Sequence, residues 1–155
     1  WNAIPDMVFR TTFIVGHPGE SDRDFEATMK LVREVGFIQA FSFKYSPRPG
    51  TPAAADEIQV AEDVKSARLD ELQAELVRQQ TAFNKSCAGK TFPVLFEKPG
   101  RHAGQLIGRT PFLQSLHAEA DSSLLGHMVD VVVEEGHQNS LTGRLAGPTD
   151  ARACA

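Results

Sequence analysis

A short turn, Gly16-His17-Pro18-Gly19-Glu20, carries the residue types best suited to ligand chemistry in this sequence. It follows an apolar run, and residues 10–20 together are typical of a buried parallel strand that ends in a Gly/Pro turn. Glycine has no side chain, so a ligand can approach its backbone closely. Open α/β sheets and α/β barrels bind ligands at the carboxyl ends of their strands. The turn therefore indicates either a small-molecule site or an ordinary strand-to-helix connection.

The elements that must position this turn form a strand, a helix and a second strand. Ser21 and Asp24 resemble a capping box, and Gly36 is a plausible stop, so a helix is expected over 21–36. Residues 37–45 alternate between apolar and polar side chains, which is typical of a strand. A strand–helix–strand unit implies a right-handed parallel crossover. The chain is therefore expected to begin inside an α/β sheet or barrel.

A second irregular loop is expected at the same edge of that sheet. Residues 46–52 contain three prolines and leave the second strand at its carboxyl end. This loop should therefore lie beside the 16–20 turn, which strengthens the interpretation of a ligand site. Arg48 in the loop is either a clamp for an anionic group or a solvated loop charge.

The rest of the chain predicts a long helix followed by a small β-barrel. Residues 60–86 have the pattern of a scaffold helix, with an apolar face but no site of its own. Beyond residue 89 the helical period disappears and turn residues recur, which favours a five-stranded antiparallel barrel. Three glycines, Gly108, Gly126 and Gly143, suit bulges or tight bends there. The expected strands are 91–97, 105–110, 114–118, 128–134 and 140–145, and the tail from 148 is expected to be disordered.

Composition excludes several classes of protein. The chain has 155 residues with a formal net charge of −4, so as a whole it is not a basic nucleic-acid binder. It shows neither a membrane-spanning run nor a signal-peptide pattern, which favours the cytoplasm. Cys87 and Cys154 lack metal-ligand spacing, and no pair of histidines has it either. Because Trp1 leads almost directly into a central strand, we expect a fragment from the C-terminal end of a longer protein.

The expected barrel has no net basic footprint. Residues 89–147 hold five Lys or Arg side chains against six carboxylates. Positive and aromatic groups could still gather on one face, or they could be a scattered, solvated surface. The residues close enough in sequence to form a mixed patch are Arg101, His102, Arg109, Phe112 and His117.

Three motifs resemble the radical S-adenosylmethionine methylthiotransferases across nearly the whole chain. Phe-Ile-Val-Gly-His-Pro-Gly-Glu (13–20) is similar to a late strand of their catalytic barrel. Tyr-Ser-Pro-Arg-Pro-Gly-Thr (45–51) is similar to the last strand and loop of the tRNA-modifying, MiaB-type branch. Residues 89–146, with Gly-Lys-Thr-Phe-Pro-Val-Leu-Phe-Glu, resemble that branch's RNA-binding TRAM barrel. The implied domains are a partial radical core (1–59), a linking helix (60–88) and a TRAM barrel (89–147).

The resemblance implies a function and a set of site residues. Such enzymes add a methylthio group to C2 of N6-isopentenyladenosine beside the tRNA anticodon, using S-adenosylmethionine and two [4Fe-4S] clusters. The implied cofactor-binding residues are Ile14, Gly16, Pro18, Gly19, Glu20, Tyr45, Ser46, Arg48 and Gly50. The implied RNA-binding residues are Lys90, Lys98, Arg101, His102, Arg109, Phe112 and Arg144. The implied partner is the tRNA anticodon arm, and the full-length enzyme is expected to be monomeric.

Departures from the family pattern limit what this chain is expected to do alone. The three-cysteine radical motif is absent, so the cluster ligands are expected outside this chain and the chain alone is expected to be inactive. His17 stands where the tRNA branch more usually has Phe, and residues 10–12 lean toward the sister branch that modifies a ribosomal-protein aspartate. The 45–51 loop and the barrel favour the tRNA branch. A free-standing RNA-binding module is the rival of a different class.

Overall fold

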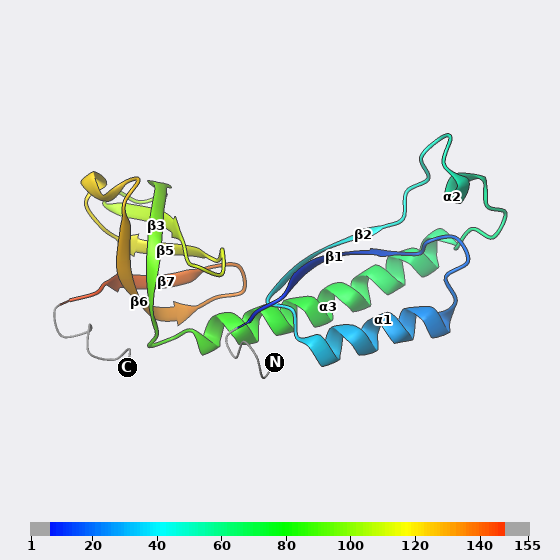
Figure 1. Cartoon of the computed structure of the whole chain (residues 1–155), viewed down its shortest axis with the longest axis horizontal. Coiled ribbons are helices and arrows are strands. Elements are labelled where there is room, and N and C mark those ends of the chain that lie inside the picture. Colours follow the sequence, from blue (N-terminus) through cyan, green and yellow to red (C-terminus); the bar gives the residue numbers. More distant parts are fainter. Residues whose placement is uncertain (1–6, 148–155) are drawn as a thin grey trace. The chain divides into compact units, whose positions relative to one another are not determined.

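The structure, a computed structural model, describes residues 7–147. The chain divides into two compact units, residues 1–80 and 81–155 (Figure 1). In the first unit, strands β1 (Arg10–Val15) and β2 (Gln39–Lys44) are connected through helix α1 (Asp22–Val35). The two strands are parallel and pair from Arg10↔Gln39 to Val15↔Lys44. The expected strand–helix–strand unit is therefore confirmed.

Helix α1 begins and ends where the sequence predicts. Ser21 is the N-cap, its hydroxyl accepts from the Asp24 N–H, and the Asp24 carboxylate accepts from the Ser21 N–H at 3.0 Å. The Ser21 hydroxyl also donates to the Asp24 carboxylate at 2.7 Å, and this bond, together with that from the Ser21 N–H, holds the pKa of Asp24 below its usual range. Gly36 adopts the left-handed conformation (φ 70°), and its N–H donates to the Val32 carbonyl. Local capping therefore fixes both ends of α1.

Both long helices of this unit cover the same face of the two strands (Figure 1). The long helix α3 (Glu62–Ser86) follows a short helix α2 (Pro52–Ala55) that lies in the connection expected to be irregular. The core shared by strands and helices is formed by Val15, Phe25, Met29, Val32, Phe37, Leu72 and Leu76. These residues come from β1, α1, α3 and the segment before β2, so packing on α3 completes the unit.

The opposite face of the strands is open. Ile14, Phe41 and Phe43 are 60%, 56% and 54% exposed there. The expectation of a strand buried on both faces is therefore wrong for the part of the chain that the structure describes. The continuous apolar run predicted cover on two sides, but within residues 7–147 only one layer of helices packs on the strands.

Helix α3 buries an unusual number of polar side chains. In the first unit, Lys65, Arg68 and Gln79 are each less than one-tenth exposed. Gln79 joins the end of α1 to the start of β2: its Oε1 accepts from the Phe37 N–H at 2.9 Å, and its Nε2 donates to the Val32 carbonyl at 2.9 Å. Buried backbone groups that would otherwise lack partners are satisfied in this way.

The second unit is a closed five-stranded barrel, as the sequence predicts. Its strands pair in the order β3-β4-β5-β7-β6, and a short 3₁₀ helix, η1 (Ser122–Leu124), precedes β6. The closing pair, β5 with β7, is parallel, which corrects the expectation of an entirely antiparallel barrel. The strands are β3 (Thr91–Pro99), β4 (Gln105–Arg109), β5 (Ser115–Glu119), β6 (Met128–Gly136) and β7 (Leu141–Leu145).

Two of the predicted glycines lie opposite breaks in the strand register. Gly108 pairs with Phe96 where β3 is irregular, and Gly143 pairs with Val133 where β6 is irregular. A Cβ on Gly143 would lie 2.6 Å from the Val132 carbonyl oxygen, so the backbones approach too closely for a side chain. Gly126 instead has a positive φ (79°) in the turn before β6. The barrel thus bends where side chains are absent.

The last turn of α3 is fastened to this barrel by an amide network. The Asn84 Nδ2 donates to the carbonyls of His137 (2.7 Å) and Gln138 (3.0 Å), and Asn84 Oδ1 accepts from Gln114 Nε2 at 2.6 Å. Beside the network, Phe112 packs edge-on against the rings of Phe83 and Phe92.

No described helix is long and apolar enough to cross a membrane. The tail expected to be disordered, 148–155, lies outside the described residues.

The buried Gln79 amide gives a test of the first unit. We expect Gln79→Ala to lower the free energy of unfolding by about 1–3 kcal/mol, because it leaves the buried Phe37 N–H without a partner. The matched control is Gln73→Ala on the exposed side of the same helix, which should change it by less than about 0.5 kcal/mol. Urea denaturation measures both, and equal losses would contradict this role for Gln79.

Candidate functional site

The two loops expected to form a site do meet at the carboxyl edge of β1 and β2. The Tyr45 N–H donates to the Val15 carbonyl at 2.8 Å, which continues the strand pairing into the second loop. The rings of His17 and Tyr45 then lie 5.2 Å apart in an edge-on arrangement. The 16–20 turn and the 45–50 loop are therefore neighbours, as their places in the strand–helix–strand unit predict.

The turn is held from inside by one carboxylate. Glu20 Oε2 accepts hydrogen bonds from the backbone N–H groups of Gly16 and His17, the latter at 3.1 Å. Gly16 adopts a positive φ (74°), which favours glycine, and the Glu20 N–H donates to the His17 carbonyl at 2.9 Å. Glu20, predicted as a binding residue, thus has both of its carboxylate oxygens occupied by protein groups.

A buried arginine from α3 pairs with this carboxylate. Arg68 Nη1 lies 3.3 Å from Glu20 Oε1 and donates to the Glu20 carbonyl at 3.1 Å. Its Nη2 donates to Asp22 at 2.7 Å, and the guanidinium lies over the Phe25 ring at 5.6 Å from its centroid. The side chains of Arg68 and Glu20 are only 8% and 12% exposed. Within the described residues this is a largely desolvated pair, unlike the exposed pairs on α1.

A lysine one turn earlier on α3 lies at the same edge. The stem of Lys65 packs against Gly16, where a Cβ would overlap its Cγ. Its ammonium lies 5.7 Å from the Tyr45 ring centroid and 3.9 Å from Glu62. Glu62 also pairs with Lys44, which lowers the pKa of Glu62. Lys65 and Arg68 were not predicted as site residues, because the sequence of α3 was interpreted as a scaffold helix. The available signal was their spacing: with Leu72 they occupy positions i, i+3 and i+7, which lie on one face of a helix.

Three features leave room for a ligand at this edge. Gly19 and Gly50 have positive φ values (79° and 82°), and a Cβ on either would meet nothing within 4 Å. The Tyr45 hydroxyl is buried and has no hydrogen-bond partner among the described residues. Ser46 and Arg48 are exposed in the adjacent loop, whereas Pro18 is buried in the turn. The edge therefore combines open backbone with an unsatisfied polar atom.

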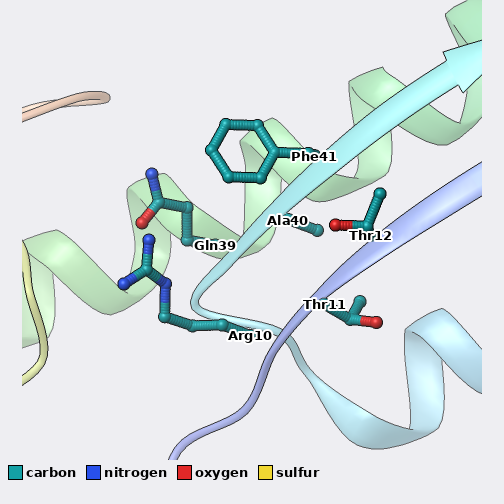
Figure 2. A pocket seen from close by; sticks show the side chains of 6 residues that line it. All are labelled: Arg10, Thr11, Thr12, Gln39, Ala40 and Phe41. Carbon is teal, nitrogen blue, oxygen red and sulfur yellow. The ribbon is translucent and has the colours of Figure 1, made fainter.

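A cavity of about 290 Å³ lies at the other, amino-terminal end of the strands. Figure 2 shows the side chains of Arg10 and Gln39, which are Cα partners in the sheet, extending in the same direction along its wall. No residue predicted to bind a ligand lines this cavity. Its lining residues are Arg10, Thr11, Thr12, Gln39, Ala40 and Phe41.

The barrel does not gather the predicted mixed patch at one place. Arg101 and His102 lie in the β3–β4 loop, beside a cavity of about 450 Å³. Phe112 lies in the β4–β5 loop, at the opposite end of the antiparallel strands, within the ring cluster described above. Arg109 pairs with Glu97 at 3.4 Å. Of the two alternatives, the described structure therefore favours scattered groups over a single patch, and which of these residues bind RNA stays a prediction.

The free cations of the barrel can be separated from the paired ones. Arg144 lies 3.9 Å from Glu134, so it is also paired. For Lys90, Lys98 and Arg101, no carboxylate of the described chain lies within salt-bridge distance. Lys98 and Arg101 share the β3–β4 end of the barrel.

His117 lies on the outer face of β5, opposite Ile107 and Thr142. Burial lowers the pKa of His117, and the charges of Arg101 and His137 lower it further. His137 in turn lies 3.1 Å from the Thr142 hydroxyl. Among residues 7–147, no three His, Cys, Asp or Glu side chains come together as a metal site.

Comparison with known proteins finds similarity in both units of the chain. The TRAM domain family model matches residues 85–146, a span that includes the whole barrel, and the closed five-stranded barrel is consistent with a TRAM domain. Over 145 residues, 94% of this chain, the sequence is 57% identical to the tRNA-2-methylthio-N(6)-dimethylallyladenosine synthase of Maricaulis maris (strain MCS10). The chain spans about a third of that relative's length (32%). The resemblance to the MiaB-type tRNA methylthiotransferases is thereby confirmed.

Two glycines of the turn should respond differently to substitution. Gly19→Ala places a side chain in open space at positive φ and should lower the free energy of unfolding by about 1–2 kcal/mol. Gly16→Ala has the same backbone strain and adds an overlap with the Lys65 stem. It should therefore lower the free energy of unfolding by about 1–3 kcal/mol more than Gly19→Ala does. Chemical denaturation of the two variants measures the difference. Equal stabilities would show that Lys65 does not pack against the turn.

The His117 pKa gives a pH dependence of defined sign. Because the pKa of His117 is lowered in the folded state, the unfolded state binds a proton more readily at this side chain. The contribution of His117 to stability is therefore fully present above its ordinary pKa of about 6.5 and is lost as the pH falls below that value. We expect His117→Asn to reduce the loss of barrel stability between neutral and mildly acid pH. Thermal unfolding measures it, with the loop variant His102→Asn as control. An unchanged pH dependence in His117→Asn would contradict the assignment.

Proposed function

We propose that this chain is part of a radical S-adenosylmethionine methylthiotransferase that modifies tRNA at C2 of N6-isopentenyladenosine beside the anticodon. The observation that carries the proposal is the 57% identity, which extends over 94% of the chain and so includes both units. The relative's printed name specifies a tRNA 2-methylthio product, and the TRAM match supports an RNA-facing barrel. A free-standing RNA-binding module would be expected to resemble the relative only in the barrel, whereas the similarity extends through the first unit as well.

The carboxyl edge of β1 and β2 fits S-adenosylmethionine. Open backbone at Gly19 and Gly50 admits close approach, and the unsatisfied Tyr45 hydroxyl offers a hydrogen bond. Ile14, more than half exposed on the strand that leads into the turn, can cover an adenine face. Gly16, Pro18 and Glu20 would shape the turn, and Ser46 and Arg48 would contact polar groups from the adjacent loop.

The bound S-adenosylmethionine supplies both the radical and the methyl group of this chemistry. The residues of this chain bind and orient it. The turn presents backbone in a fixed conformation, because Glu20 holds the Gly16 and His17 N–H groups. Ile14 and Phe43, apolar side chains on the open face, would exclude water beside the strand ends once a ligand covers them.

The described residues do not fit an iron–sulfur cluster. Such clusters are held by several Cys thiolates, whereas Cys87 is buried with its sulfur directed to the Phe83 carbonyl at 3.3 Å. Cys154 lies outside the described residues. We therefore propose that any cluster of the enzyme takes its ligands from other parts of the protein.

The barrel is proposed to bind the anticodon arm through its unpaired cations. Phosphate contacts come mainly from Lys and Arg side chains, and a cation already paired with a carboxylate gains less from a phosphate. Lys98 and Arg101 therefore make stronger candidates than Arg109 and Arg144, which face Glu97 and Glu134. His102 lies next to Arg101 beside the same cavity.

RNA binding by the barrel can be tested with one substituted pair. We expect the full chain to bind an anticodon stem-loop RNA that lacks the methylthio group. Lys98→Gln with Arg101→Gln should weaken binding and lower the slope of log K against log salt by about 0.7 for each phosphate that is no longer neutralised. Arg109→Gln is the matched control, since its guanidinium is already paired. Fluorescence anisotropy measures all three.

The outcomes separate the possible functions. Selective binding of the unmethylthiolated arm supports the tRNA branch, and non-selective binding favours a general RNA-binding module. Absence of binding by the full chain would contradict the proposed role of the barrel and favour the branch that modifies a ribosomal protein. A loss in Arg109→Gln as large as in the double variant would contradict the choice of residues.

A further inference from the structure

We propose that Arg68 is a positioning residue for S-adenosylmethionine, acting through Glu20 on the 16–20 turn. Arg68 lies on α3, 48 residues after Glu20, and neither the family match nor the relative's name assigns it a role. The part of the inference that concerns the ligand rests on the proposed function. The part that concerns the turn rests on the contacts alone.

The contacts form an unbroken chain from α3 to the turn backbone. Arg68 meets Glu20 at two points, the carboxylate at 3.3 Å and the carbonyl oxygen at 3.1 Å. The other carboxylate oxygen of Glu20 accepts from the Gly16 and His17 N–H groups. Each contact is charge-assisted, so each is stronger than a neutral hydrogen bond.

Burial makes the arginine necessary for this arrangement. The Glu20 side chain is 12% exposed, and a carboxylate at that depth is unfavourable unless a cation and hydrogen bonds compensate it. Without Arg68 the carboxylate would be favoured to rotate toward water. It would then leave the Gly16 and His17 N–H groups without their acceptor.

Asp22 is not an equivalent partner for Arg68. It lies 2.7 Å from Nη2, but its side chain is 99% exposed and therefore well solvated without the arginine. The Phe25 ring fills the space beneath the guanidinium and restricts its movement. Arg68 is thus directed to Glu20, and the expected result of its loss is a loosened turn and not a general unfolding.

Amide hydrogen exchange in the 155-residue chain tests the effect on the turn. In Arg68→Met, the Gly16 and His17 amides should exchange about tenfold faster or more, while the amides of α1 stay within about twofold of wild type. Arg68→Lys, which keeps the charge, should restore part of the protection. The control is Arg78→Met on the same helix, where the side chain is 67% exposed. Unchanged exchange at Gly16 and His17, or an equal rise throughout α1, would overturn the proposal.

Equilibrium dialysis with S-adenosylmethionine, on the protein expressed from its complete reading frame, tests the effect on the ligand. In the wild-type background, Arg68→Met should weaken S-adenosylmethionine binding by about tenfold or more. In a protein that already carries Glu20→Gln, the same substitution should weaken binding by less than about twofold, because both substitutions act through the Glu20 carboxylate. Equal losses in the two backgrounds would overturn the proposal. If wild type fails to bind S-adenosylmethionine, the proposed function fails, and the exchange result still decides whether Arg68 holds the turn.

Discussion

Helix α3 depends on buried polar side chains to hold its neighbours, and this constraint governs the rest of the structure. Arg68 compensates the buried Glu20 carboxylate, and Gln79 satisfies backbone groups where α1 ends and the next segment begins. At the last turn of the helix, Asn84 does the same for two carbonyls of the barrel. Such groups are costly when unpaired in the interior, so each fixes one geometry.

This constraint explains how the carboxyl edge of β1 and β2, the proposed ligand edge, keeps its conformation in the described chain. The conformation of the 16–20 turn depends on Glu20 accepting two backbone N–H groups, and the Lys65 stem packs against the turn at Gly16. The open glycines and the unsatisfied Tyr45 hydroxyl are then presented at a fixed place. A rigid edge with one unsatisfied polar atom and open backbone suits a small ligand better than a macromolecular surface.

Local signals predicted much of the fold, and long-range packing decided the rest. The Ser21 and Asp24 pattern predicted the start of α1 because capping depends only on neighbours in sequence. The parallel closing pair of the barrel joins strands separated by β6, so no local pattern could indicate it. For the candidate site, the Gly-Pro turn predicted where the two loops meet, whereas Arg68 was missed because an arginine on a helix is usually exposed. Arg101 and Phe112 are close in sequence but do not form one patch, because successive loops lie at opposite ends of antiparallel strands.

The most direct test of the proposed function is mass spectrometry of tRNA nucleosides from the source organism after deletion of the gene that encodes this chain. We predict that 2-methylthio-N6-isopentenyladenosine disappears, that N6-isopentenyladenosine accumulates, and that the intact gene restores the methylthio group. Unchanged 2-methylthio-N6-isopentenyladenosine in the deletion strain would contradict the proposed function.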